Sequence, residues 1–366
     1  MSELSRTSPV HILIVGAGAV GCFYASKLHQ TYESRPILVS LVCRSNYKAI
    51  ANDGVSLETH SFGNYHFTPH KVFPSIAAAG EAGFKWDYVV VTTKALPDVT
   101  NDAHDIRPLV TRGVEGSCIV LIQNGVGIEE VHRVEFQENP IVSAVTVISA
   151  EQVRHGVIKQ NRWTRITMGT YTNGQAKPNS LLSDSHLLNR LTETTNTHIH
   201  NLVSWFTATG IKDAEFAPEL SLQQTRWHKL CINASMNPSS VLSGGTTNSR
   251  MSLDPELRQH LHACMNEIFD TAPKILGIPF DDKKHASPER ILKSTERNTA
   301  GKPSMLLDWQ AGRPMELEVI LGNPIRIARR DGIEMPRLQT LYALLKMAQI
   351  RKKEDAAAGE GAKAKL

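Results

Sequence analysis

The first half of the chain alternates short apolar runs with polar and helix-like segments. One run opens at Val10, and others occupy 37–43, 87–94 and 117–124, where hydrophobic residues follow one another almost without interruption. Such runs predict strands that are covered on both faces, because a sheet with one face in water would alternate apolar and polar residues. We therefore expect an α/β domain with a doubly wound, mostly parallel sheet over 10–215.

The second half is patterned as helices, with apolar residues at helical spacing. The predicted helices cover 222–236, 254–275, 288–296, 316–331 and 337–351. No strand-like run of comparable strength interrupts these segments. We therefore predict an all-α second domain over 216–351.

Three segments fall outside this regular patterning. Residues 1–9 are predicted to be a flexible lead-in, and the polar stretch 170–186 an irregular insertion. The last segment, 352–366, is low in complexity and lacks aromatic and β-branched residues, which predicts a disordered tail.

A glycine motif directly follows the first apolar run and precedes a helix-like pattern. Gly16, Gly18 and Gly21 have G-x-G-x-x-G spacing. In a dinucleotide-binding fold the first glycine allows a tight turn, the second lets the backbone approach a pyrophosphate, and the third permits close helix–strand contact. The context therefore predicts a Rossmann-type domain whose helix N-terminus faces the phosphates of a cofactor. The predicted loop residues are Gly16, Ala17, Gly18, Ala19, Val20 and Gly21.

The end of the second predicted strand bears on which dinucleotide binds. An NAD site usually has an acidic residue there, but this chain has Arg44, followed by Ser45 and Asn46. A guanidinium with neighbouring hydroxyl and amide donors suits a 2′-phosphate, which a carboxylate would repel. This favours NADPH over NADH, and a solvated basic loop is the alternative.

The third and fourth predicted strands each end in a polar residue followed by turn-forming residues. These residues are Lys94 and Asn124. In open α/β sheets ligands lie beyond the carboxyl ends of the strands, so both residues are expected at the cofactor edge. The alternatives are a solvated loop lysine for Lys94 and an ordinary Asn-Gly turn for Asn124.

Three polar residues are spaced four apart in an apolar segment of the second domain. They are Lys229, Asn233 and Asn237. On one helix this spacing aligns them along a single face. A buried lysine without a partner is costly, which indicates a cleft or a ligand, whereas a surface lysine beside two capping amides is the alternative.

Composition narrows the possible partners and compartments. The net charge of +4 is spread without a basic block, so neither nucleic acid nor a membrane surface is an expected partner. The five cysteines form no C-x-x-C pair and predict small core residues in a reducing compartment, and no H-E-x-x-H pattern indicates a metal site. Without a hydrophobic leader or a membrane-length apolar run, we expect a cytoplasmic protein, with a mitochondrial one as the alternative.

Five motifs, in order, resemble those of one enzyme family. They are the Gly16–Gly21 loop, TTKA at 92–95, QNGVG at 123–127, W-x-K-L-x-x-N-x-x-x-N-P at 227–238 and SMLLDWQAGRPMELE at 304–318. Together they resemble the ketopantoate reductases and span the chain apart from its two ends and the 170–186 region. The resemblance implies NADPH-dependent reduction of 2-dehydropantoate to pantoate, a step toward pantothenate and coenzyme A.

The resemblance also implies roles for individual residues. The family's catalytic lysine falls on Lys229, and its substrate-binding asparagines fall on Asn233 and Asn237. Its residues that face the nicotinamide and the substrate fall on Lys94 and Asn124.

The last motif adds residues that, by the same resemblance, hold the substrate and support the lysine. They are Ser304 and Glu316. Glu318 competes with Glu316, because residues two apart on a helix point about 200° apart and only one can face a cleft. Ser304 read alone is an N-cap candidate. A further substrate-binding asparagine of the family matches only Asn248, and only by a one-residue shift.

These residue types suit reduction of a keto acid. Hydride addition leaves negative charge on the carbonyl oxygen, and a lysine in a partly desolvated cleft can donate a proton to it. Burial would lower the pKa of Lys229 toward working pH, and Glu316 would oppose that shift by favouring the ammonium form. Asparagines orient a polar 2-oxo acid without adding charge.

Two other functions remain open. One is a related NADPH-dependent reductase of another 2-oxo acid or ketone, since the motifs specify cofactor and proton donor more than the far end of the substrate. The other is a non-catalytic NADPH-binding redox sensor, against which the retention of a proton donor argues. The helical second domain also offers surfaces for a homodimer.

Overall fold

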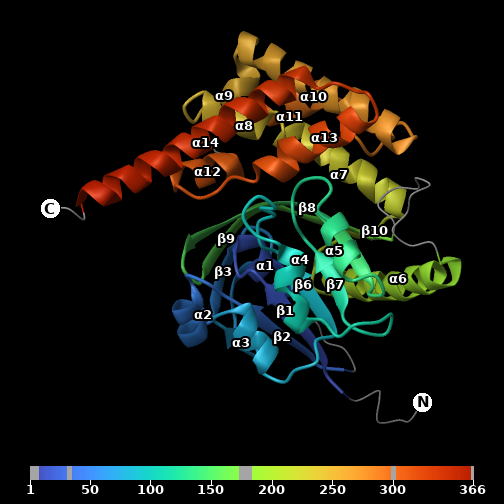
Figure 1. Ribbon diagram of the computed structural model, residues 1–366. Coiled ribbons are helices and arrows are strands. Elements are labelled where there is room, and N and C mark those ends of the chain that lie inside the picture. The colour runs from blue at the N-terminus through green and yellow to red at the C-terminus, as the bar shows by residue number, and fades with distance from the viewer. Residues whose placement is uncertain (1–7, 31–34, 173–183, 298–301, 364–366) are drawn as a thin grey trace. The chain divides into compact units, whose positions relative to one another are not determined.

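The computed structural model describes residues 8–30, 35–172, 184–297 and 302–363 (Figure 1). The chain divides into two compact units, each described here by itself. The sheet unit comprises 1–94, 101–123 and 128–222, and the helical unit comprises 95–100, 124–127 and 223–366. Two short segments that follow strands of the sheet therefore pack with the helical unit.

A single mixed sheet forms the centre of the sheet unit. Its strands are β1 (Val10–Val15), β2 (Ile37–Val42), β3 (Val55–Thr59), β4 (Gly63–Phe67), β5 (Val72–Phe73), β6 (Tyr88–Val91), β7 (Cys118–Leu121), β8 (Ile141–Arg154), β9 (Val157–Thr170) and β10 (Ala214–Phe216). They lie in the order β4-β3-β9-β8-β7-β6-β1-β2-β5, with β10 beside β9. The strands from β5 to β8 are all parallel, and the pairs β8–β9 and β3–β4 are antiparallel. The predicted mostly parallel, Rossmann-type sheet is confirmed.

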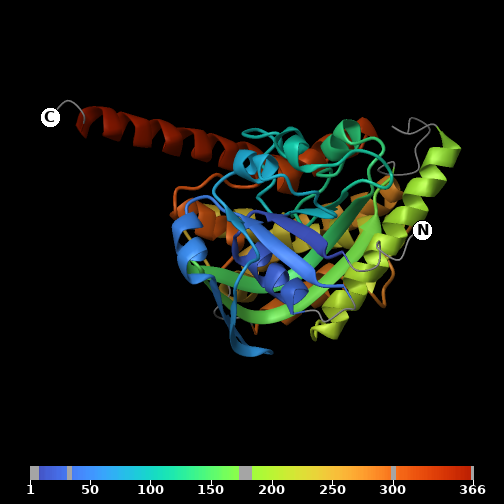
Figure 2. The same cartoon turned by 90° about the horizontal axis from the view of Figure 1, so that it is seen from below.

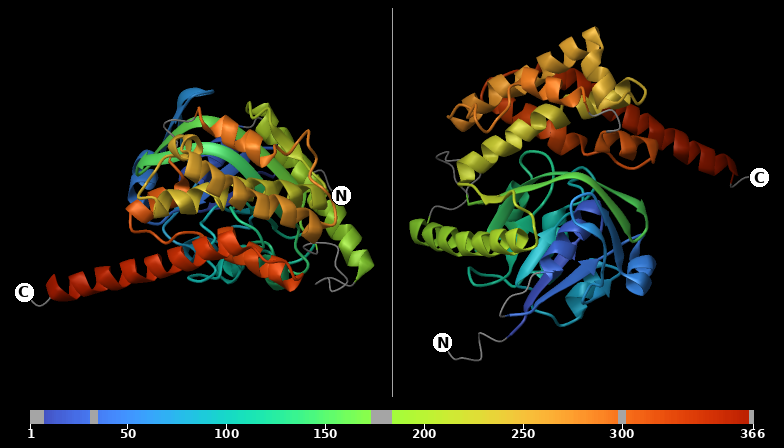
Figure 3. Two further views of the ribbon diagram at one scale, coloured as in Figure 1. Left: turned by 90° about the horizontal axis from the view of Figure 1, so that it is seen from above. Right: turned by 180° about the vertical axis from the view of Figure 1, so that it is seen from behind.

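Helices cover both faces of this sheet. On one face lie α1 (Ala19–His29) and α6 (Ser185–Ala208), seen from behind in Figure 3, and these two helices contact each other. The remaining helical elements of the unit are α2 (Tyr47–Asp53), α3 (Ile76–Glu81), α4 (Asp102–Asp105), η2 (Arg107–Leu109) and α5 (Glu130–Glu135). Figure 1 shows α3, α4 and α5 on the opposite face. All five cysteines of the chain are buried and free, as predicted.

The long β8–β9 hairpin was not predicted from the sequence. The first six residues of β8 are buried and none of the rest is, and β9 mixes buried and exposed positions with register shifts in the pairing. Its hydrophobic pattern therefore changes along each strand, so neither a continuous apolar run nor strict alternation marks it.

Every regular element described in the helical unit beyond α7 is helical, as predicted. These elements are α7 (Glu219–Asn233), which begins in the sheet unit, α8 (Met236–Leu242), α9 (Asn248–Leu253), α10 (Pro255–Leu276), α11 (Pro288–Thr295), α12 (Ser304–Gln310), a π-helical turn (Glu318–Gly322), α13 (Asn323–Arg330) and α14 (Pro336–Lys363). The predicted helices at 254–275 and 288–296 match α10 and α11 closely.

The predicted single helix over 222–236 is wrong at its end. The chain turns at Ala234 and Ser235, and α8 starts afresh at Met236. A continuous helix would need the amide of Pro238 to donate to the carbonyl of Ala234, but proline has no N–H and its ring clashes with that carbonyl. Asn237 is therefore not on the same helix as Lys229.

The last two predicted helices also differ from those in the structure. The segment 316–331 begins as the π-helical turn before it becomes α13. The helix predicted over 337–351 continues as α14 to Lys363, through most of the segment for which a disordered tail was predicted. Alanine, glutamate and lysine, which favour helix, dominate that segment. Figure 2 shows its second half extending beyond the other helices of the helical unit.

The predicted lead-in and insertion fall largely outside the described residues, which omit 1–7 and 173–183. Among the residues described, no helix combines the length and the apolar composition that a membrane crossing requires.

Candidate functional site

The glycine loop joins β1 to α1 with a geometry that only glycine permits at two positions. Gly16 has a φ of +111°, and a Cβ there would lie 2.8 Å from the backbone nitrogen of Thr93. A Cβ on Gly21 would lie 2.1 Å from the carbonyl oxygen of Gly16. At Gly18 a Cβ would meet nothing within 4 Å. The first and third glycines therefore let the chain pack on itself. The second leaves open space, where a bound ligand is expected to approach the protein backbone.

Two side chains hold this loop in place. The hydroxyl of Thr92, after β6, donates to the carbonyl of Gly16 at 2.6 Å. The amide of Asn46 donates to the carbonyl of Ala17 at 2.6 Å and to Oε1 of Gln152 at 3.0 Å. Because both N–H groups of Asn46 are engaged, its predicted role as a phosphate donor is wrong. The residue instead supports the loop, a role that no sequence signal indicated.

The other cofactor residues predicted in the sheet unit have different exposures. Arg44 is exposed just after β2, and Lys94 is half-buried just after β6. The β1–β6 pair lies where the strand order reverses, since β2 follows β1 on its other side. In doubly wound sheets the ligand crevice lies beyond the carboxyl ends at such a point.

Three of the predicted residues meet within the helical unit. Lys229 Nζ donates to Asn124 Oδ1 at 2.7 Å, and Asn124 Nδ2 donates to Glu316 Oε2 at 3.3 Å. The backbone amide of Ala95 donates to Glu316 Oε1, also at 3.3 Å. Lys229, Asn124 and Glu316 are named the lysine group below. Asn124 thus links the ammonium to the carboxylate, and the segment that carries it packs with the helical unit.

The position of Asn124 depends on a tightly held loop, 124–127. Gly125 has a φ of +91°, and a Cβ there would lie 2.5 Å from Cβ of Val319 on the π-helical turn. The Val126 amide donates to the Val319 carbonyl at 2.9 Å, and Asn323 Nδ2 donates to the Val126 carbonyl at 2.8 Å. Glycine is required at 125 because the loop lies directly on the π-helical turn.

The surroundings of Lys229 favour a proton donor. The residue is half-buried on α7. The pKa of Lys229 is lowered to about 8, first by burial and second by the positive charge of Arg226, while the carboxylate of Glu316 opposes both effects. Such an amine is mostly protonated at neutral pH and can still release its proton. Arg226 was not predicted from the sequence. The one signal that could have indicated it is its position one turn before Lys229 on the helix.

Glu316 and Glu318 are both buried but face different partners. Glu318 binds Arg326 at 2.7 Å and accepts a hydrogen bond from Tyr342 at 2.5 Å. Glu316 precedes the π-helical turn, so the helical geometry assumed for the pair is wrong. The two carboxylates nevertheless diverge, and of these two Glu316 is the one hydrogen-bonded to Asn124.

Two family models match the chain. One, ketopantoate reductase PanE/ApbA, covers residues 12–173, and the other, ketopantoate reductase PanE/ApbA C terminal, covers 221–349. The chain belongs to the ketopantoate reductase family. An uncharacterized protein of Saccharomyces cerevisiae is 31% identical to it, over 94% of each chain. The 2-dehydropantoate 2-reductase of Nostoc is 27% identical over 91% of this chain and 93% of its own length.

Solved structures agree with this assignment. A 2-dehydropantoate 2-reductase from Methylococcus capsulatus has a TM-score of 0.75 and 29% identity, and the match covers 94% of this chain and 98% of that one. A D-mandelate dehydrogenase with NADH and anilino(oxo)acetate has a TM-score of 0.71 over 94% of this chain and 99% of its own, but its 16% identity shows the fold alone.

The cofactor of the ketopantoate reductase family is NADPH, and the glycine loop fits it. Open space at Gly18 allows a pyrophosphate to approach the backbone, and α1 begins at Ala19 with its N-terminus at the loop. The glycine loop that fits the dinucleotide lies in the sheet unit.

The four predicted substrate residues lie in the helical unit in differing environments. Asn233 is half-buried at the end of α7, and Asn237 is buried with 4% of its surface exposed. Ser304 is exposed as the first residue of α12, where Pro303 holds the cap position, so the N-cap alternative does not apply. Among the described residues, none of these four forms a hydrogen bond with the lysine group. Their substrate-binding roles therefore stay predictions.

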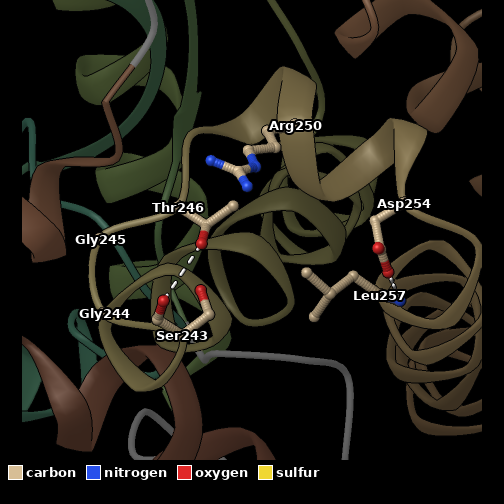
Figure 4. A pocket seen from close by; sticks show the side chains of 7 residues that line it. All are labelled: Ser243, Gly244, Gly245, Thr246, Arg250, Asp254 and Leu257. Atoms are coloured by element: carbon tan, nitrogen blue, oxygen red, sulfur yellow. Dashed lines mark hydrogen bonds between the residues drawn. The ribbon is translucent and has the colours of Figure 1, made fainter.

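Asn248, the fourth of these residues, begins α9 between Thr246 and Arg250, which line a polar cavity. The cavity has a volume of about 420 Å³ and is drawn in Figure 4. It is lined by Ser243, Gly244, Gly245, Thr246, Arg250, Asp254 and Leu257. Oδ1 of Asn248 is buried and accepts no hydrogen bond from any described residue. This segment is also where the sequence departs from the family pattern.

Proposed function

We propose that the protein reduces 2-dehydropantoate to pantoate with NADPH, a step toward pantothenate and coenzyme A. The lysine group carries the proposal, because it joins a lysine of lowered pKa to a carboxylate through a fixed amide. A protein that only bound NADPH would need the glycine loop but not this arrangement. The two relatives named as 2-dehydropantoate 2-reductases support the same substrate.

Lys229 acts as the general acid. When bound, reduced nicotinamide supplies a hydride to the keto carbon of the substrate. The carbonyl oxygen becomes negative as a result, and the ammonium of Lys229 gives it a proton. General acid catalysis of this kind contributes a rate factor on the order of 10²–10⁴.

Asn124 and Glu316 keep that ammonium oriented and charged. Asn124 fixes the direction of the Lys229 side chain through its 2.7 Å hydrogen bond. The carboxylate of Glu316 favours the protonated amine, which keeps the donor loaded at neutral pH. Each residue thus acts on the proton donor rather than on the substrate carbon.

The remaining predicted residues have binding roles in this proposal. Asn233, Asn237, Ser304 and Asn248 hold the carboxylate and hydroxyl of the substrate, since amides and hydroxyls orient such groups without adding charge. In the sheet unit, Arg44 binds the 2′-phosphate of NADPH and Lys94 lies toward the nicotinamide.

The direct test is NADPH oxidation by the purified protein with a panel of 2-oxo acids. We expect 2-dehydropantoate to have the highest kcat/KM of the panel. A tenfold preference for another keto acid would reject the substrate and keep the reaction type. If no member of the panel is reduced while NADPH still binds, the non-catalytic sensor is the better function.

A reductase of another 2-oxo acid is the second candidate. The polar cavity at 243–257 favours it, because its lining contains Arg250 and three hydroxyl or carboxyl side chains in a segment that departs from the family pattern. The same fold also serves a D-mandelate dehydrogenase, which acts on a different 2-hydroxy acid. Because the guanidinium of Arg250 could bind a second anionic group of a substrate, 2-oxo acids with such a group belong in the panel.

A further inference from the structure

Arg226 is a buried cation whose position on α7 is next to the proton donor. Only 3% of its surface is exposed. It lies three residues before Lys229, so the two side chains share one side of the helix. A guanidinium is seldom buried without strong acceptors, and Nη1 of Arg226 donates to the carbonyl of Gly125 at 3.0 Å.

This hydrogen bond ties the 124–127 loop to α7, in addition to the contacts of the loop with Val319 and Asn323. Val319 and Asn323 bind Val126 of the loop, and Arg226 binds the preceding residue from α7. The residue just before these contacts, Asn124, accepts the hydrogen bond from Lys229 through its side chain. Arg226 and Lys229 therefore bind adjacent residues of one short loop from the same helix.

Lys229 has one positive and one negative side chain next to it, and their effects on its pKa oppose each other. Arg226 faces it from α7 with a positive charge, and Glu316 faces it from the segment before the π-helical turn with a negative one. Asn124 from the loop adds a neutral acceptor. An arginine does not lose its proton in this range, so its charge on the lysine is constant with pH.

We propose that Arg226 is a positioning residue that fixes the Asn124 loop on α7 and keeps a second positive charge beside Lys229. The link to proton donation rests on the proposed function, but the effect on Lys229 itself does not. Arg226 touches the loop rather than the reacting atoms, so it acts through Asn124 and Lys229.

The charge is tested with Arg226→Gln and Arg226→Lys in the full chain labelled with ¹³Cε-lysine. The Lys229 signal is assigned by its loss in Lys229→Arg, and its titration is followed by NMR without any substrate. Losing the cation should raise the pKa of Lys229 by about half a unit or more in Arg226→Gln. Arg226→Lys should titrate as the wild type does. Arg330→Gln is the matched control, because Arg330 is exposed at the end of α13 and its loss should shift nothing.

An unchanged titration in folded Arg226→Gln would overturn the proposal, and so would equal shifts in the Gln and Lys variants. If Arg226→Gln does not fold, Arg226→Lys still tests the loop. A lysine keeps the charge but cannot reproduce the guanidinium geometry, so kcat should fall about tenfold with the pH profile unmoved. Wild-type kcat in that variant would remove the positioning role. Failure of the reductase assay would leave the NMR result standing, so the two proposals fail separately.

Discussion

The glycine loop and the lysine group are built in opposite ways. The loop lies within six consecutive residues, 16–21, and its geometry follows from a strand, a turn and a helix that are neighbours in sequence. The lysine group joins Lys229 to Asn124 across 105 positions and Asn124 to Glu316 across 192. A local motif can be read directly from a sequence, whereas a distributed group exists only once the chain has folded.

The two regions also differ in the physical property that each depends on. The glycine loop depends on the absence of side chains, since a Cβ at Gly21 would collide with the backbone of Gly16. The lysine group depends on charges and hydrogen bonds between side chains. Substitutions should therefore change cofactor binding in the first region and proton donation in the second.

The largest expected effect is that of a substitution at Lys229, which should abolish proton donation without changing cofactor binding. Lys229→Ala should lower kcat by about 10²–10⁴-fold, because the general acid is lost, while the Kd for NADPH stays near that of the wild type. Steady-state kinetics and a fluorescence titration with NADPH measure the two quantities. Lys284→Ala, at an exposed lysine of the same unit, is the control and should change neither. Loss of NADPH binding in Lys229→Ala would mean that the residue contacts phosphate or supports the fold.

The next prediction distinguishes two glycines of the loop, one needed for cofactor binding and one also needed for packing. Gly18→Ala places a methyl group in open space, so the free energy of unfolding should stay within about 1 kcal/mol of the wild type while the Kd for NADPH rises tenfold or more. Gly21→Ala should weaken both, because its Cβ would lie 2.1 Å from the Gly16 carbonyl oxygen. Thermal unfolding without cofactor and NADPH titration measure these effects. Equal stability losses in the two variants would contradict the distinction.

The third prediction concerns cofactor preference. Arg44→Ala should weaken NADPH binding by about 10–100-fold, the range for loss of a charge-assisted hydrogen bond, and leave NADH binding nearly unchanged. Comparing the Kd values of both cofactors in wild type and variant measures this. An equal loss for NADPH and NADH would remove the 2′-phosphate contact. Lys48→Ala, at an exposed lysine four residues away, provides the control.

The same contrast explains how much the sequence could predict. The strands β1, β2, β6 and β7 and the glycine loop were found because short-range patterns define them. The β8–β9 hairpin was missed because its burial changes along its length. The break after α7 was missed because the effect of Pro238 on the preceding turn was overlooked.

For the candidate site, the predicted residues came from a family resemblance, and their grouping came from the fold. Asn124 was expected at the cofactor edge of the sheet, yet its loop packs with the helical unit. The loop-supporting role of Asn46 and the contribution of Arg226 were not predicted because each acts through a backbone carbonyl, of Ala17 and Gly125, and no side-chain pattern encodes such a contact.

The smallest expected effect separates two carboxylates two residues apart. Glu316→Gln removes the charge that favours the Lys229 ammonium, so the pKa of Lys229 should fall below its value of about 8. A general acid works only while protonated, and reduction is lost as pH rises through that pKa. The alkaline limb of kcat/KM should therefore move to lower pH, opposite to the shift expected for Arg226→Gln.

Glu318→Gln is the matched control for this shift. Glu318 is also buried, but Arg326, Tyr342 and Lys346 are its partners. Its loss should lower the thermal stability of the helical unit and leave the alkaline limb in place. Glu316 would have no electrostatic role at Lys229 if both variants moved the limb equally, because the effect would then come from the general loss of a buried carboxylate. A shift in Glu316→Gln alone would show that the lysine group depends on one specific charge, just as the glycine loop depends on specific missing side chains.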